Sequence, residues 1–514
     1  MNARAPGRAA PRLLPAAGWL LAGWILAGWL LAGSLLPPRA AAQSGPEAQG
    51  IVSLRATTQY YDSITPWIKT AEQNVLGSAL VVEGRKLLTS ADLVKNANLI
   101  EVRKFGHFPD YQARAVLVDY EANLALLEVE GPEFWEGLRT LPLASKPVRS
   151  GTFTINRWRP NGRFEQGTGE ISDYQIGTSR FGTMEFPVLR GTTTVSGLGW
   201  AEVITSGGQV AGLLTSHDNQ QIEATPAGVL SLFIQAGRRQ PYPGFAHRGF
   251  AWQQLNQAAL RRYFGLTDSK SGILVRRVHA GGTGAGQLKV GDILTKLGPY
   301  TIDPEGQIEH PLYGQMLFSM VINESLEETL PVELVRDGKP RTLRLRRSRY
   351  APGDYRIFPY RFDGPIDYEV QGGLVVQEFS QGYLRAWGKS WPERAPPRLV
   401  IEAMLSSLRE SGSPTEKVLL VTKVLPDPVN LGYDDLQNTI LLKANGRPLS
   451  GLADFRAALK TPANGFQVLE FLPGQSRGKV VFKANTLESA NQRIRERYDV
   501  PARPPLLQQA QAAP

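Results

Sequence analysis

Short apolar and β-branched runs recur at close intervals between Ile51 and about Gly237, and turn residues separate them. Runs of this length and spacing predict an antiparallel β-sandwich or β-barrel domain over residues 50–237. We expect strands at 78–82, 86–89, 99–102, 113–118, 124–129, 153–155 and 210–214.

The pattern changes after Gly249. A helical stretch at 255–263 is followed by an apolar strand over 271–278, a Gly-rich turn and the sequence Gly291-Asp292-Ile293-Leu294. A hairpin comes next, because Asp337-Gly338 is a strong two-residue turn signal between two alternating runs. These features predict a separate α+β domain over 244–348.

In residues 349–514 we expect a connector over 349–413, a second unit similar to the one at 244–348 over 414–486, and a C-terminal region over 487–514. We expect a strand at 373–378 and a helix at 399–411 in the connector, and strands at 418–425 and 437–442 in the second unit. Residues 487–497 predict a helix, and the Pro-, Gln- and Ala-rich end is expected to be disordered.

The N-terminal 42 residues have the features of a signal peptide. Arg4, Arg8 and Arg12 supply positive charge, residues 19–36 are apolar, and Ala40-Ala41-Ala42 fits a cleavage site. We expect secretion across an inner membrane, with the mature protein in a bacterial periplasm. Because the apolar run just reaches spanning length, residues 19–36 are an alternative membrane anchor if the signal is not cleaved.

Composition narrows the function classes. A chain of 514 residues is long enough for about three domains, and its net charge of +10 comes from scattered residues without a nucleic-acid motif. The absence of cysteine excludes disulfides and thiolate catalysis. Five scattered histidines argue against a metal site, and we expect no cofactor.

Three segments carry candidate chemistry. They are Leu88-Thr89-Ser90-Ala91-Asp92-Leu93-Val94, then Asn123-Leu124-Ala125-Leu126-Leu127, and Ser196-Gly197-Leu198-Gly199-Trp200 before the strand at 210–214. In order and spacing they resemble the catalytic segments of the trypsin-like Deg/HtrA serine proteases. The resemblance places Asp92 at the histidine position, Asn123 at the aspartate position and Gly199 at the nucleophile position.

All three triad positions are therefore substituted. A carboxylate is a much weaker base near neutral pH than an imidazole, and a triad that loses serine or histidine loses most of its rate. We also expect Gly197 to retain an oxyanion-hole amide, and Trp200 to block the cleft or fill it as core. The prediction is a pseudoprotease that serves as a scaffold, chaperone-like or regulatory factor in protein quality control.

Two alternatives stay open. Ser196 could act as a displaced nucleophile with His107 or His217, which would make the chain an active serine endopeptidase. The chain could also be a non-catalytic subunit that assembles with an active Deg paralogue.

The unit at 244–348 resembles a PDZ domain, which binds peptide C-termini by adding them as a strand to a sheet edge. The resemblance implies a peptide site at Ser271, Gly272, Ile273 and Leu274, with unfolded proteins or peptide C-termini as partners. The second unit is PDZ-like but has Asn438-Thr439 where the first has Gly-Asp, so we expect a structural role there.

The pattern Leu431-Gly432-Tyr433 followed by Asn438-Thr439 resembles the plant-type Deg branch. The family implies a mainly β fold, with a trypsin-like double β-barrel followed by two PDZ-like α+β domains. It also implies trimer-based homo-oligomers and no nucleic-acid partner.

Overall fold

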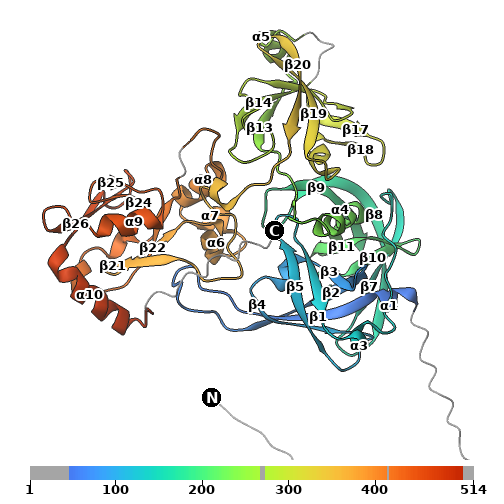
Figure 1. The fold of residues 1–514 in the computed structure, drawn as a ribbon, viewed down its shortest axis with the longest axis horizontal. Helices are drawn as coiled ribbons and strands as arrows, with labels where there is room; N and C mark the ends of the chain where they lie inside the picture. Colours follow the sequence, from blue (N-terminus) through green and yellow to red (C-terminus); the bar gives the residue numbers. More distant parts are fainter. Residues whose placement is uncertain (1–44, 267–271, 414–415, 502–514) are drawn as a thin grey trace, which may run out of the picture. The chain divides into compact units, whose positions relative to one another are not determined.

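The computed structural model describes residues 45–266, 272–413 and 416–501, and it begins with two closed six-stranded β-barrels (Figure 1). The first barrel has the order β1-β2-β3-β6-β5-β4, with β1 Ile51–Thr58, β2 Gln73–Val82, β3 Lys86–Thr89, β4 Ala97–Arg103, β5 Tyr111–Asp119 and β6 Leu124–Val129. The second has the order β10-β11-β12-β9-β8-β7, with β7 Gly151–Trp158, β8 Phe164–Thr178, β9 Glu185–Thr193, β10 Val203–Ser206, β11 Gln209–Asp218 and β12 Gln221–Pro226. This confirms the predicted double barrel.

All seven strands expected in this region are present, because their alternating residues bury one face in a barrel core. Helix α4 (Ala227–Gly237) packs Leu230 and Phe233 into a cluster that includes Ile51 and Val203, so residues from both barrels share one core. The sequence did not predict β8, which is rich in glycine and polar residues. A Cβ at Gly169 in β8 would lie 2.3 Å from the Phe153 ring, so close packing against the neighbouring strand requires glycine.

A third sheet follows the barrels, in the order β13-β14-β15-β19-β20 with β16 beside β15. The strands are β13 Phe250–Gln254, β14 Ile273–Val278, β15 Ile293–Leu297, β16 Tyr300–Thr301, β19 Thr329–Arg336 and β20 Lys339–Arg346. A small hairpin, β17 Gln307–His310 and β18 Gly314–Leu317, leads to the 3-10 helix η1 Phe318–Asn323. Both Asp337 and Gly338 have positive φ, as the predicted hairpin turn requires.

Helix α5 (Ala258–Tyr263) begins three residues after the predicted start, because residues 255–257 connect it to β13, which ends at Gln254. His279 follows β14, and burial together with the charges of Arg277 and Arg248 lowers its pKa to about 4.

The fourth sheet repeats this strand order. It runs β21-β22-β23-β24-β26-β27 with β25 beside β24, so β22, β23, β24, β26 and β27 correspond to β13, β14, β15, β19 and β20. The strands are β21 Tyr368–Gln371, β22 Leu374–Glu378, β23 Leu419–Val424, β24 Thr439–Ala444, β25 Arg447–Pro448, β26 Phe466–Phe471 and β27 Lys479–Lys483. The predicted connector therefore contributes two strands to the second PDZ-like sheet, and β21 has no counterpart in the first.

Helices complete this part of the chain. Between β22 and β23 lie α6 Gln381–Leu384, η3 Arg385–Trp387, α7 Trp391–Arg394 and α8 Pro397–Leu405. The helix predicted to reach residue 411 thus ends at Leu405. Helix α9 (Leu452–Leu459) precedes β26, and the predicted C-terminal helix is α10 (Ala484–Arg497), whose Ile494 packs with Tyr368 and Val370 of β21.

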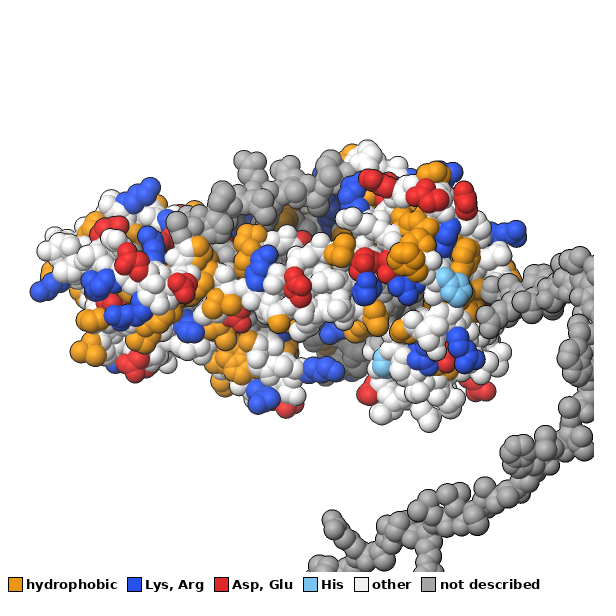
Figure 2. Space-filling view, turned by 90° about the horizontal axis from the view of Figure 1, so that it is seen from below, with side chains coloured by type: hydrophobic (Ala, Val, Ile, Leu, Met, Phe, Trp, Pro, Cys, Tyr) orange, Lys and Arg blue, Asp and Glu red, His pale blue; other side chains and the backbone are white. Residues whose placement is uncertain are grey.

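The surface is mixed in charge. Figure 2 shows Lys and Arg side chains interspersed with Asp and Glu on the face that it draws. Across the three described ranges, no helix is long and apolar enough to span a membrane. The predicted signal peptide at 1–42 and the last thirteen residues, 502–514, lie outside the described residues.

Candidate functional site

The structure brings Asp92 and Asn123 together. Asp92 lies on the short helix α2 (Ala91–Val94) directly after β3, and Asn123 precedes β6 with a positive φ that asparagine tolerates. The amide N–H of Asp92 donates to Asn123 Oδ1 at 2.9 Å, and the N–H of Ala91 donates to the Asn123 carbonyl at 3.2 Å. Asn123 therefore holds the backbone of the residue at the general-base position.

The Asp92 carboxylate forms ion pairs with two cationic side chains. Its side chain is only 2% exposed, with Oδ1 paired to Lys95 and Oδ2 lying 2.9 Å from Nη1 of Arg180, in the loop between β8 and β9. A carboxylate held by two cations on both oxygens serves as an ion-pair partner and not as a free proton acceptor. The residue at the general-base position is therefore part of a structural ion pair.

Aromatic rings surround this ion pair. The Arg180 guanidinium lies 5.0 Å from the ring centroid of Trp200, and the Lys95 ammonium lies 5.0 Å from that of the buried Phe181. Trp200 also packs against the core of the first barrel. Of the two alternatives predicted for Trp200, blocking the cleft or filling it as core, the structure favours the second. Trp200 is partly buried against the core, and the Arg180 guanidinium lies over its ring.

Hydrogen bonds to neighbouring side chains hold the backbone of the loop at the predicted nucleophile position. Gly199 N–H donates to Glu202 Oε1 at 2.7 Å, so this amide does not face an incoming carbonyl. Arg157 donates to the carbonyls of Ser196 and Gly197 at 3.0 and 2.6 Å, and to Glu202 Oε1 at 3.1 Å. Burial raises the pKa of Glu202, while the Gly199 amide and Arg157 oppose that rise.

Ser196 has no imidazole partner among the described residues. Its side chain is exposed, and no side-chain hydrogen bond there involves Ser196 Oγ, His107 or His217. His107 lies in the loop between β4 and β5, and His217 lies on the exposed end of β11. The structure therefore does not assemble either of the two alternative nucleophile–base pairs.

Glu121, a partly buried carboxylate near Asn123, contacts groups from several segments. Glu121 accepts hydrogen bonds from Thr183 N at 2.9 Å and Tyr355 Oη at 2.8 Å, and it lies 3.2 Å from His247 Nε2. Burial would raise the pKa of Glu121, but these partners outweigh it and hold the pKa below its usual value. The connector residue Tyr355 is thus tied to the barrel near the degenerate triad.

The predicted peptide-binding residues do not lie at a free edge. Ile273 and Leu274 are buried, and their strand β14 pairs with β13 on one side and β15 on the other. A Cβ at Gly272, where φ is +137°, would lie 2.4 Å from the Leu294 carbonyl oxygen, so close strand packing explains this glycine. Ser271 lies outside the described residues. The prediction that this strand supplies the pairing edge is wrong, because β13, which was not predicted as a strand, pairs along one side of it.

The terminal strand of the first PDZ-like sheet is β13. Within the described residues it pairs only with β14, and two further backbone bonds lie just outside its ends, from His279 N to the Gly249 carbonyl and from Leu255 N to the Pro304 carbonyl. On β13 itself, the Phe250 ring stacks on the ring of Phe318 in η1, and the Trp252 ring meets the Phe318 ring edge-on. This strand is the candidate edge for an added peptide strand.

In the second PDZ-like sheet the corresponding edge is occupied. Strand β21 pairs with β22 over the register Tyr368↔Gln377 to Gln371↔Leu374. Arg456 of α9 ties β21 in place, with bonds to Asp367 at 2.6 and 3.0 Å, to Glu369 at 3.0 Å and to the Tyr368 carbonyl at 3.0 Å. The chain itself therefore fills the place that an added strand would take.

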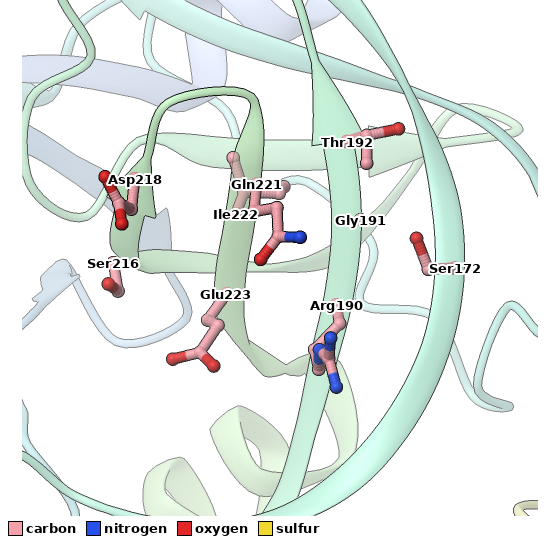
Figure 3. Close-up of a pocket in the computed structure, with 9 residues that line it drawn as sticks. All are labelled: Ser172, Arg190, Gly191, Thr192, Ser216, Asp218, Gln221, Ile222 and Glu223. Carbon is pink, nitrogen blue, oxygen red and sulfur yellow. The ribbon is translucent and has the colours of Figure 1, made fainter.

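A polar pocket lies elsewhere, on the second barrel (Figure 3). Strands β8, β9, β11 and β12 supply its lining, which consists of Ser172, Arg190, Gly191, Thr192, Ser216, Asp218, Gln221, Ile222 and Glu223. Asp92, Asn123 and Gly199 do not line it, so it is separate from the predicted triad positions.

Comparisons with known proteins agree with this architecture. A family model described as PDZ domain matches residues 357–504. Protease Do-like 2, chloroplastic, from Arabidopsis thaliana is 24% identical over 463 residues, which cover 88% of this chain and 74% of that protein. Protease Do-like 4, mitochondrial, from the same plant is 22% identical over 405 residues, covering 77% and 74%.

Among solved structures, one described as HtrA-type protease AlgW with decapeptide is 17% identical, with a TM-score of 0.44. The match covers 59% of this chain and 97% of that one. The plant relatives confirm the predicted resemblance to the Deg/HtrA proteases of plant type.

Proposed function

We propose that this chain, a PDZ-containing relative of the plant-type Deg/HtrA proteases, is a pseudoprotease that binds unfolded polypeptides without cleaving them. One observation carries the proposal. The residue at the general-base position, Asp92, is buried in an ion pair with Lys95 and Arg180, and the residue at the nucleophile position, Gly199, has no hydroxyl. A scaffold or chaperone-like role in protein quality control follows.

The organisation of the former oxyanion region supports the same proposal. An oxyanion hole needs donors aimed at the developing charge of the substrate. Here the Gly199 amide is already bonded to Glu202. Restoring a hydroxyl alone would therefore leave the site without one of its donors.

Peptide binding is assigned to the edge of β13. Strand addition to a PDZ-like sheet gives affinity through backbone hydrogen bonds, and β21 already pairs with the corresponding strand of the second sheet in this way. Among the described residues, β13 in the first sheet therefore has no added strand, whereas its counterpart β22 in the second sheet has β21.

The proposal is tested first by proteolysis. The purified protein and its Ser196→Ala variant are incubated with denatured casein and with a fluorophosphonate probe, beside an active Deg protease. We expect neither cleavage nor labelling by either form. Cleavage or labelling that disappears in Ser196→Ala would contradict the proposal and establish the displaced-nucleophile alternative.

Binding is tested separately by photo-crosslinking. A photoreactive residue replaces the exposed Gln253 on β13 or, as a matched control, the exposed Thr342 on β20, the opposite edge strand. A synthetic peptide with a free apolar C-terminus should crosslink at position 253 and not at 342. Equal yields at both positions would reject the assignment to β13.

Export is part of the proposal. It rests on the charged, apolar and small-residue order of residues 1–42. N-terminal sequencing of the protein from its native cells should find a start near Gln43. An intact N-terminus in a membrane fraction would instead support an anchor at 19–36.

A further inference from the structure

Three cations gather around one buried ring beside the degenerate triad. The Phe181 side chain is 5% exposed, and its ring centroid lies 5.0 Å from Lys95, 5.9 Å from Arg180 and 5.3 Å from Arg385. Arg385 is on η3 and donates to the Arg180 carbonyl at 3.4 Å. The three cationic side chains therefore lie close together around the Phe181 ring.

Among the described residues, one carboxylate pairs with these cationic side chains and offsets part of their charge. Asp92 pairs with Lys95 and Arg180, while Arg385 has no acidic partner among the described residues. The neighbouring Asp363 is engaged elsewhere, accepting from the Asn96 amide at 2.6 Å and from the Tyr120 hydroxyl. The cluster thus carries more positive than negative charge.

The electrostatics of the cluster reflect this excess. Burial and the charges of Arg180 and Arg385 lower the pKa of Lys95 to about 8. Burial also lowers the pKa of Arg180, and burial together with Arg180 lowers that of Arg385. An anion placed among the three groups would relieve their mutual repulsion.

We propose that Lys95, Arg180 and Arg385 form a binding site for a carboxylate group, supplied by an acidic peptide segment of a partner protein. Arg180 is accessible, with 51% of its side chain exposed, and a guanidinium matches the planar geometry of a carboxylate. The rings of Trp200 and Phe181 give the site an apolar wall for the adjoining part of the peptide. This site is separate from the β13 edge and does not depend on peptide binding there.

The test is calorimetric titration of the full protein with three probes at low salt. The first is a peptide of alternating Glu and Gly with an amidated C-terminus, the second an acetylated glycine peptide with a free C-terminus, and the third inorganic phosphate. Binding of the first probe that weakens as salt is raised supports acidic side chains as the source. Binding of the second alone supports a chain terminus as the source of the same carboxylate.

Variants locate the site. Arg385→Gln is the main one, because Arg385 has no ion pair to lose, and it should weaken peptide binding about fivefold. Arg398→Gln, which removes an exposed arginine on α8, is the charge-matched control and should leave binding unchanged. Binding of phosphate but of neither peptide, or equal affinity of the Arg385→Gln variant and the unaltered protein, would overturn the proposal.

Discussion

Replacing Asp92 by asparagine measures whether the residue at the predicted general-base position has a structural role. Removing one partner of a fully buried ion pair costs about 3–5 kcal/mol, whereas an exposed pair contributes about 1 kcal/mol or less. Side-chain exposures of 2% for Asp92, 29% for Lys95 and 51% for Arg180 place this pair between those limits. We expect Asp92→Asn to destabilise the barrels by about 2 kcal/mol, since the two cations lose their counter-charge.

The assay is thermal unfolding followed by circular dichroism. For a domain of this size, about 2 kcal/mol corresponds to a fall in Tm of about 4–8 °C. Asp110→Asn is the matched control, because Asp110 also pairs with two arginines, Arg103 and Arg55, but is 23% exposed. A double-mutant cycle with Arg180→Gln should show coupling. A fall in Tm no larger than that of Asp110→Asn, or no coupling, would refute the structural role.

Three further predictions follow from the same geometry. The triple variant Asp92→His, Asn123→Asp, Gly199→Ser should still not cleave casein, because the amide at 199 stays bonded to its internal carboxylate; turnover would contradict this. Because the pKa of His279 is lowered in the folded protein, its contribution to stability is fully present above about pH 6.5 and is lost as pH falls toward about 4. The midpoint of urea unfolding should therefore fall over that pH range, and the fall should be smaller in the His279→Gln variant. Arg456→Ala should speed amide exchange in β21, which α9 then no longer holds; unchanged exchange would show that pairing with β22 suffices.

Local patterns in the sequence predicted the barrel class but not every strand, since β1, β8, β9, β10 and β12 were not among the expected strands. Alternating runs predicted seven strands, and the spacing of the motif segments correctly brought Asp92 beside Asn123. Lys95 could also have been identified, because it lies three residues after Asp92, at the C-cap of the same short helix. Arg180 could not, since 88 residues separate it from Asp92 and nothing local marks it as a partner.

The peptide edge was misplaced for a different reason. The run beginning at Phe250 has aromatic residues typical of a strand, but only the helix at 255–263 was predicted there, so β13 was missed. The resemblance to a PDZ domain then placed the peptide site on residues 271–274, next to the apolar strand that follows. Its continuous burial is instead typical of an interior strand, since Ile273, Leu274 and Val275 are all buried.

The substitutions in the former catalytic cleft are physically linked. A histidine at position 92 would leave Arg180 and Lys95 without their shared carboxylate, and like charges would then crowd Phe181. A side chain at position 199 would place its Cβ 3.2 Å from Glu202 Oε1, which the Gly199 amide now binds. Asp92 therefore has an ion pair that a histidine would remove, and position 199 has little room for a side chain beside Glu202, so catalysis at these positions would require changes at Arg180 and Glu202 as well.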